Sequence, residues 1–394
     1  MERVADSTTK AEAFQIDISE AALGDLRDRL GRSRFAADFA NADWSYGTNG
    51  SYLRALIDYW HDGYDWRRHE AAMNGYANYR VSIDGIPIHF IHEPGRGPRP
   101  MPLVLTHGWP WTFWDYEKLI RPLADPGSYG GDPADAFHVV VPSLPGFGFS
   151  TPLEVQGVHW GRTAELWVSL MREVLGYERF AAQGGDWGAI VTAELGHRFA
   201  EHLHGIHLTL PGHPAFLTRM RPDDAGPGEA DWAARQASRR HAITSHMAVH
   251  SADPQSLAYA LNDSPVGLAA WLVERRRAWS DCGGDVERCF SKDDLLTNLS
   301  IYWLTQSIGT SLRFYKESMG RYRWKPAHDR EPAIQSPTGI AVFLGELMLL
   351  PRKTAERAAN LVHWSVFDSG GHFAPAEQPE RLLEDIRSCF RKLR

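Results

Sequence analysis

The stretch GGDWG, residues 184–188, stands between a short apolar run at residues 180–182 and the helix-favouring run AIVTAELGHRF at residues 189–199. Glycine at both ends of these five residues allows a tight turn from strand to helix. A turn of this kind exposes its central side chain, which here is Asp186. The stretch therefore predicts a strand, a sharp turn and a helix, with one carboxylate at the apex.

This stretch also has the glycine–x–nucleophile–x–glycine pattern of the nucleophile elbow in the α/β-hydrolase fold, with Asp in place of the usual Ser. A carboxylate is ionised at neutral pH and can displace a leaving group at saturated carbon, which gives an alkyl-enzyme ester. The N-terminus of the following helix would help to hold the charge. The alternative is that Asp186 is an ordinary N-cap residue after a glycine turn.

Short apolar runs on both sides of the elbow indicate further buried strands. They lie at residues 103–105, 137–141, 206–210, 340–344 and 363–367, and helical segments separate most of them. Strands that alternate with helices are typical of a mainly parallel sheet. Residues 79–90 alternate with period two around Asp84-Gly85, which predicts a β-hairpin, and Pro87 places one of its strands at an edge. The expected class is α/β, an α/β-hydrolase fold with a mostly parallel eight-stranded sheet.

Two segments extend this core. Residues 14–78 show apolar positions at helical spacing, so residues 1–100 are expected to form a helical N-terminal domain leading into the hairpin. Residues 211–330 are charged and helical, with a capping-box pattern at Ser291 and Asp294, and are expected to form a helical cap. The core itself then comprises residues 79–210 and 331–394.

Composition excludes several classes of protein. The 394 residues contain 42 basic and 49 acidic side chains, a net charge of -7, so no basic field favours binding to nucleic acid. No apolar run suggests a membrane span, and the first twelve residues lack the apolar region of a secretory signal. Three cysteines are too few for a disulfide framework. We expect a cytoplasmic protein.

Three further features follow the elbow pattern in the expected places. HGWP at residue 107 comes directly after a predicted strand, where the fold takes one oxyanion-hole N–H, here that of Trp109. The second N–H would be that of Trp187. Glu346 follows the run at 340–344, and His372 follows the last predicted strand. The order Asp, Glu, His is that of the α/β-hydrolase triad.

With these residues identified, the sequence resembles the microsomal-type epoxide hydrolases from about Phe14 to the C-terminus. The segments that carry the resemblance are HGWP at 107, PSLPGFGFS at 142, GGDWG at 184, ALNDSPVGLAAW at 260, RFYKE at 313 and SGGHFAP at 369. That family also places a helical block before the α/β-hydrolase core and a helical cap within it.

The resemblance implies a role for each site residue. Asp186 would be the nucleophile, His372 the base, Glu346 the acid that orients it, and Tyr315 a cap tyrosine that donates a hydrogen bond to the epoxide oxygen. The family usually supplies a second cap tyrosine, and at the aligned position this chain has His246. His246 is either a donor or an ordinary histidine on a helix surface, in which case Tyr315 acts alone.

The substrate and partners follow as expectations. Aromatic side chains at Trp109, Trp187, Phe149 and Trp111 are expected to bind a bulky apolar or aryl epoxide. Some soluble bacterial relatives act in antibiotic biosynthesis, including on aryl epoxides that lead to enediynes, and the resemblance implies such a role here; the Ala-, Arg- and Gly-rich composition would suit an actinobacterial source. No cofactor or metal is expected, no nucleic acid or membrane partner, and a homodimer would be unsurprising. The vertebrate members carry an N-terminal membrane anchor, and none is visible here.

Two other functions remain open at this point. A haloalkane dehalogenase uses the same fold, an Asp nucleophile and a Trp after it, but an expelled halide does not need a proton donor such as Tyr315. A non-catalytic binding protein on this scaffold would be expected to lose a triad residue, and all three are present. An ester or peptide hydrolase is disfavoured because the elbow has no Ser.

Overall fold

The computed structural model describes residues 10–394. A single sheet runs through this part of the chain in the order β1-β2-β3-β5-β4-β6-β7-β8-β9. The strands are β1 (Glu12–Ala13), β2 (Asn78–Ile83), β3 (Ile86–Glu93), β4 (Met101–Thr106), β5 (Phe137–Pro142), β6 (Phe180–Gly184), β7 (Leu203–Leu208), β8 (Ile334–Gly345) and β9 (Ala359–Gly371). From β5 to β9 every pair of neighbours is parallel, so the α/β class is confirmed.

The sheet has nine strands within the described residues rather than the expected eight. The additional strand is β1, whose two residues pair antiparallel with Arg80 and Tyr79 of β2. Two residues carry no readable hydrophobic period, so the sequence could not reveal this strand.

The hairpin of β2 and β3 forms as predicted, but Pro87 does not mark an edge. Asp84 and Gly85 both have positive φ, 51° and 77°, as a type I′ turn requires. Strand β3 lies between β2 and β5, so the edge prediction was wrong. Pairing with β5 begins only at Phe90, and the missing N–H of Pro87 therefore removes no hydrogen bond on that side.

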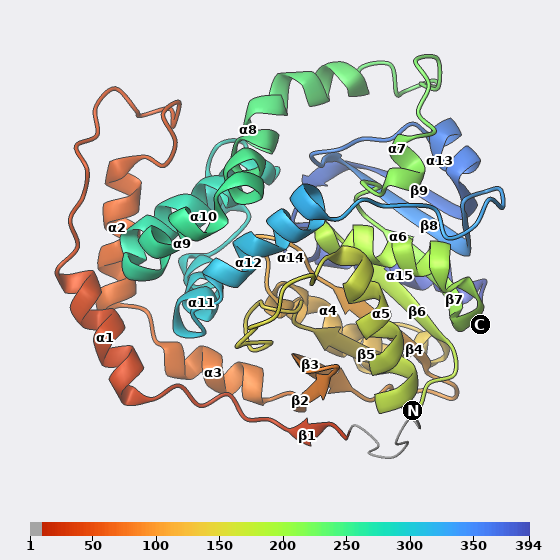
Figure 1. Ribbon diagram of the computed structural model, residues 1–394, viewed down its shortest axis with the longest axis horizontal. Coiled ribbons are helices and arrows are strands. Elements are labelled where there is room, and N and C mark those ends of the chain that lie inside the picture. The colour runs from red at the N-terminus through yellow and green to blue at the C-terminus, as the bar shows by residue number, and fades with distance from the viewer. Residues whose placement is uncertain (1–9) are drawn as a thin grey trace, which may run out of the picture.

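Helices cover both faces of the sheet and form a second layer beside it (Figure 1). They are α1 (Glu20–Gly31), α2 (Gly50–Asp62), α3 (Trp66–Asn74), α4 (Glu117–Ala124), α5 (Trp160–Ser169), α6 (Trp187–Arg198), α7 (Pro214–Leu217), α8 (Trp232–Ala252), α9 (Pro254–Asp263), α10 (Pro265–Trp279), α11 (Lys292–Leu304), α12 (Ile308–Tyr315), α13 (Arg352–Ala358), α14 (Ala374–Glu377) and α15 (Pro379–Arg391).

The segment between β7 and β8, which contains the expected cap residues, holds helices α7 to α12. Helix α11 begins at the predicted capping box, in which Ser291 accepts from Asp294 N and the Asp294 carboxylate accepts from Ser291 N. The N-terminal helices α1 and α2 pack against α10, and α3 packs against α11. The N-terminal block therefore contacts the inserted helices as well as the sheet (Figure 1).

Four loops that carry expected site residues follow parallel strands. The loop after β4 begins at His107, Asp186 follows β6, Glu346 follows β8 and His372 follows β9. The carboxyl ends of parallel strands lie at one edge of the sheet, which is where ligands bind in open α/β sheets. The topology thus brings together residues that are up to 265 positions apart in the chain, from His107 to His372.

In residues 10–394 no helix is long and apolar enough to span a membrane. The expectation that the chain lacks a signal sequence rests largely on residues 1–9, which lie outside the described residues.

Candidate active site

Asp186 stands at the apex of a sharp turn between β6 and α6. Its backbone angles, φ 49° and ψ -127°, are sparsely populated by residues other than glycine and indicate local strain. The turn packs so tightly on β4 that a Cβ at Gly188 would lie 1.9 Å from the carbonyl oxygen of Thr106. The nucleophile elbow predicted from GGDWG is therefore present in the backbone.

The N-cap alternative for Asp186 fails. Asp186 occupies the N-cap position of α6, but its side chain makes no capping hydrogen bond. Instead Oδ1 accepts a hydrogen bond from the backbone N–H of Trp109, at 2.7 Å. Trp187, whose N–H was the second expected donor, is the first residue of α6, where N–H groups have no acceptor within the helix. Of the two expected donors, Trp109 N–H therefore binds the carboxylate, and Trp187 N–H belongs to the next residue in the chain.

His372 joins Asp186 to Glu346. Its Nδ1 lies 2.7 Å from Oε1 of Glu346 in a hydrogen bond, and its Nε2 lies 3.2 Å from Oδ2 of Asp186. The side chains of His372 and Glu346 are buried, whereas that of Asp186 remains 16% exposed. The three residues predicted from chain order are therefore in contact, with the carboxylate of Asp186 as the member open to a ligand.

The charge of His372 depends on these two carboxylates. Burial alone would lower the pKa of His372, but the negative charges and hydrogen bonds of Glu346 and Asp186 outweigh burial and raise the pKa to about 10. The imidazole is therefore protonated at neutral pH. Neutralising Asp186 would remove one of the causes of this shift and favour loss of the proton.

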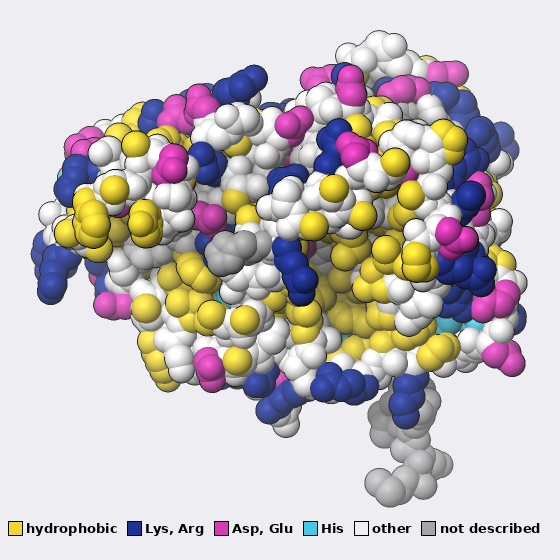
Figure 2. Space-filling view, turned by 90° about the horizontal axis from the view of Figure 1, so that it is seen from above, with side chains coloured by type: hydrophobic (Ala, Val, Ile, Leu, Met, Phe, Trp, Pro, Cys, Tyr) yellow, Lys and Arg dark blue, Asp and Glu magenta, His cyan; other side chains and the backbone are white. Residues whose placement is uncertain are grey.

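An apolar cavity of about 420 Å³ opens in front of Asp186. Its walls come mainly from α6, from the segment between β7 and β8 and from the loop after β8, and they include Trp187, Trp279, Ile243, Met247, Met319, Trp324 and Leu347. Hydrophobic side chains also gather in a hollow on the face of the molecule seen in Figure 2. Walls of this kind suit an apolar ligand with few polar groups.

Tyr315 and His246 line the same cavity and contact each other. The Tyr315 hydroxyl lies 3.1 Å from Nε2 of His246, and both side chains are buried. His246 is 4% exposed, so it is not the helix-surface histidine that the sequence left open. Tyr315 is the last residue of α12 and His246 lies on α8, so two inserted helices bring these groups over Asp186.

Both groups are neutral in this environment. Burial raises the pKa of Tyr315 well above its ordinary value, and the charge of Asp186 raises it further. Burial lowers the pKa of His246 well below its ordinary value, and the nearby His250 and Arg275 lower it further. Tyr315 therefore keeps its hydroxyl proton, and His246 has one N–H and one free lone pair.

Three of the four expected substrate-binding side chains do not line the cavity. The ring of Trp109 stacks on that of His246 and lies behind it, so only its backbone faces Asp186. The ring of Trp111 packs against His372 and Phe373. Phe149 packs with Phe14, His89 and Phe113 near β3. The side chains of Trp109, Trp111 and Phe149 thus fill the protein core, and of the four expected residues only Trp187 lies in the cavity wall.

The sequence did not reveal Trp279, which serves the site in two ways. Its ring lines the cavity, and its carbonyl oxygen accepts a hydrogen bond from the backbone N–H of His372 at 3.0 Å. Trp279 ends α10, almost a hundred residues before His372. Its apolar character predicts burial, but no local pattern indicates what it packs against.

The chain matches two family models. One, described as "Epoxide hydrolase N terminus", matches residues 11–116, and the other, described as "alpha/beta hydrolase fold", matches residues 101–379. Epoxide hydrolase 1 of Oryctolagus cuniculus is 36% identical over 399 residues, which cover 95% of this chain and 87% of that protein.

Two solved structures have the same fold over nearly their whole length. The juvenile hormone epoxide hydrolase from the silkworm Bombyx mori is 27% identical, with a TM-score of 0.84 and coverage of 98% of this chain and 95% of that one. The Aspergillus niger epoxide hydrolase is also 27% identical, with a TM-score of 0.83 and coverage of 97% and 96%.

Proposed function

The chain belongs to the epoxide hydrolases that join the epoxide hydrolase N-terminal domain to an α/β-hydrolase fold, and on that premise we propose that it opens an epoxide through an ester formed on Asp186. The observation that carries this proposal is the line of contacts from Glu346 through His372 to Asp186, facing Tyr315 across an apolar cavity. In this proposal Asp186 is the nucleophile, His372 is the base and Tyr315 is the proton donor, with Asp186 and Tyr315 in the cavity wall and His372 in contact with Asp186.

In the first step Oδ2 of Asp186 attacks a ring carbon, and the bond between that carbon and the epoxide oxygen breaks. Trp109 N–H holds Oδ1, which leaves Oδ2 as the attacking oxygen. The Tyr315 hydroxyl hydrogen-bonds the epoxide oxygen and transfers its proton to the alkoxide. His246, with its proton on Nε2, donates to the Tyr315 oxygen and stabilises the tyrosinate. The product is a hydroxyalkyl ester.

In the second step water hydrolyses the ester. Esterification removes the charge of Asp186, so the pKa of His372 falls, and the proton that it releases replaces the one lost by Tyr315. Neutral His372, oriented by Glu346, then takes a proton from a water that attacks Cγ of Asp186. The tetrahedral oxyanion forms on Oδ1, where a backbone donor such as Trp109 N–H contributes about 3 kcal/mol. Collapse releases a vicinal diol, whose leaving oxygen takes the proton from His372.

The cavity supports a bulky apolar or aryl epoxide as substrate. A volume of about 420 Å³ lies within the range of small-molecule sites, and the wall is formed mainly by Trp, Met, Leu and Ile side chains. Flat aromatic groups pack well against such rings. Aryl epoxides of the kind formed in antibiotic biosynthesis fall within this class.

A single turnover in water labelled with ¹⁸O tests the ester mechanism. With enzyme in excess over an aryl epoxide, the first diol should carry unlabelled oxygen from Asp186, and the peptide that contains Asp186 should gain one ¹⁸O. Mass spectrometry of diol and peptide measures both. Label in the first diol and none in the peptide would mean direct attack by water and would overturn the proposal. Halide release from haloalkanes by the same preparation, without epoxide turnover, would favour a dehalogenase.

Tyr315→Phe is expected to lower the rate of ester formation by about 10²-fold, because the opening ring loses its proton donor while the cavity keeps its shape. Rapid-quench measurement of ester formation checks this rate. Tyr302→Phe is the matched control, since Tyr302 is also buried but donates its hydroxyl to the carbonyl of Trp111 and does not line the cavity. Equal loss in both variants would argue against a proton-donor role for Tyr315.

A further inference from the structure

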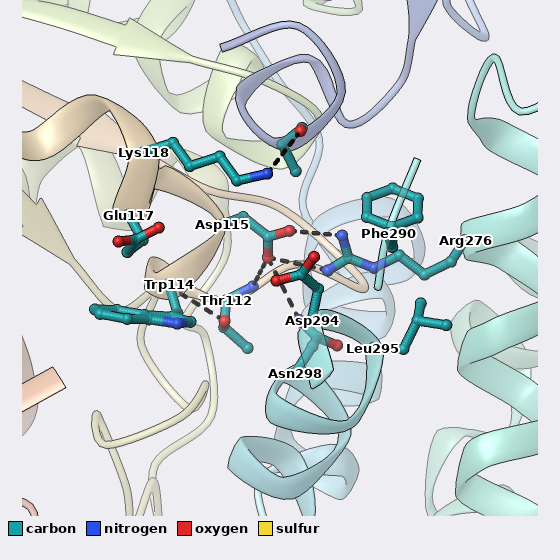
Figure 3. Close-up of a pocket in the computed structure, with 11 residues that line it drawn as sticks. Thr112, Trp114, Asp115, Glu117, Lys118, Arg276, Phe290, Asp294, Leu295 and Asn298 are labelled. Atoms are coloured by element: carbon teal, nitrogen blue, oxygen red, sulfur yellow. Dashed lines mark hydrogen bonds and ion pairs between the residues drawn. The ribbon is translucent and has the colours of Figure 1, made fainter. Parts of the chain in front are cut away.

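A buried ion pair lies behind the active site, outside the residues that line the cavity. Arg276 of α10 donates from Nη1 to Oδ1 of Asp115 at 2.5 Å and from Nη2 to Oδ2 at 3.0 Å (Figure 3). The two side chains are only 5% and 7% exposed. Burying a charged pair costs several kcal/mol of desolvation per ion, so an arrangement of this kind is weak evidence for stability alone.

The Asp115 carboxylate is tied to the loop that carries Trp109. Its Oδ2 accepts the backbone N–H of Thr112 at 2.8 Å and closes a capping box at the short helix η1 (Phe113–Tyr116). Arg276 reaches the same loop directly, because Nη2 also donates to the carbonyl of Pro110 at 3.1 Å. Pro110 follows Trp109, whose N–H holds Oδ1 of Asp186.

The same guanidinium contacts the loop of His372. Its central carbon lies 4.3 Å from the ring centroid of Phe373, the residue after His372, at the distance of a cation–π contact. Three residues further along α10, the carbonyl of Trp279 accepts the N–H of His372. One end of α10 therefore holds two loops that are about 260 residues apart in the chain.

We propose that Arg276 is a positioning residue that fixes the distance between the oxyanion-hole loop at Trp109 and the base at His372. This inference rests on the proposed ester mechanism. Hydrolysis of the ester needs both loops at once, because water must lie between His372 and Cγ while Trp109 holds the oxyanion. Ester formation depends less on this distance, because Trp109 N–H then holds a carboxylate that is losing its charge and His372 transfers no proton. A displacement of 1 Å at such a contact can cost about 10²-fold in rate.

Arg276→Lys tests the inference because an ammonium group keeps the charge but cannot bind Asp115 and Pro110 in the planar geometry of a guanidinium. In single turnovers followed by intact-mass spectrometry, we expect ester hydrolysis to slow by about 10- to 100-fold and ester formation to change by less than about threefold. In the steady state kcat and KM then fall together and kcat/KM is retained, because hydrolysis follows the ester-forming step. A structural role alone would not produce this pattern.

Arg357→Lys is the matched control. Arg357 of α13 binds both carboxylate oxygens of Asp224, at 2.9 and 2.6 Å, and a backbone carbonyl, that of Arg219, away from the catalytic loops. We expect a similar loss of thermal stability in this variant, with both single-turnover rates within about twofold of the wild type. Asp115→Asn tests the same link from the partner side and is expected to slow hydrolysis selectively, should Arg276→Lys fail to fold.

Three results would overturn the inference. Unchanged hydrolysis in folded Arg276→Lys, or in Asp115→Asn if the first does not fold, would leave the ion pair with a structural role only. Equal slowing of ester formation and hydrolysis would mean that the pair acts on Asp186 itself. Absence of any ester in the wild type would overturn the proposed function and this inference together, whereas the first two results leave the ester mechanism intact.

Discussion

Asp186→Asn is expected to abolish diol formation, with a loss of about 10⁴-fold or more in kcat. The neutral amide keeps the shape of the side chain and the hydrogen bond from Trp109, but its oxygen is a poor nucleophile toward saturated carbon. The loss thus reports on the chemistry of the carboxylate rather than on packing. The rate of diol formation from an aryl epoxide, followed by chiral chromatography, measures this loss.

The Asp186→Asn variant can regain activity by deamidation of the new side chain. An amide at position 186 lies next to His372 and the Trp109 N–H, and in the proposed roles of these groups water would hydrolyse the amide back to Asp. Intact mass distinguishes the two forms by about 1 Da, and Asp186→Ala provides a variant that cannot revert. Diol formation by Asp186→Ala at more than about one hundredth of the wild-type rate would show that Asp186 is not the nucleophile.

His372→Gln is expected to form the ester at close to the wild-type rate and then to hydrolyse it about 10²- to 10⁴-fold more slowly, because the water loses its base. One equivalent of epoxide should therefore be consumed rapidly, and little diol should follow. Intact-mass spectrometry should show an adduct of the full epoxide mass, and peptide mapping should place it on Asp186.

His363→Gln is the control for this experiment. His363 also bonds a buried carboxylate, that of Asp385; it lies on β9, the strand that His372 follows, and does not line the cavity. It should accumulate no adduct and should turn over epoxide at close to the wild-type rate. If folded His372→Gln formed no adduct with any epoxide that the wild type hydrolyses, the ester mechanism would be excluded.

Local patterns predicted most of the core. The glycines of GGDWG predicted a tight turn, and the structure has that turn, with positive φ at Asp186. Six apolar runs became parallel strands, and the residues after β6, β8 and β9 meet because parallel strands end at one edge. The contact of Glu346, His372 and Asp186 follows from that topology.

The wall of the cavity could not be predicted in the same way. Trp109, Trp111 and Phe149 are as aromatic as Trp187, and their positions in motifs suggested the same role, yet their rings pack into the core. Whether an aromatic side chain of a loop reaches the cavity depends on what packs against it. For Trp109 that is His246 on α8, which lies far away in the sequence.

The sequence by itself determined the backbone turn at Asp186, the parallel strands, and the positions of Asp186, Glu346 and His372 directly after them, because each strand and turn depends on residues close to one another in the chain. Only the tertiary structure decided the contact of His246 with Tyr315, the cavity wall, and the placement of Arg276 between the loops of Trp109 and His372. These depend on how the inserted helices pack on the sheet, and the energy of that packing is spread over many side chains that have no common spacing in the sequence.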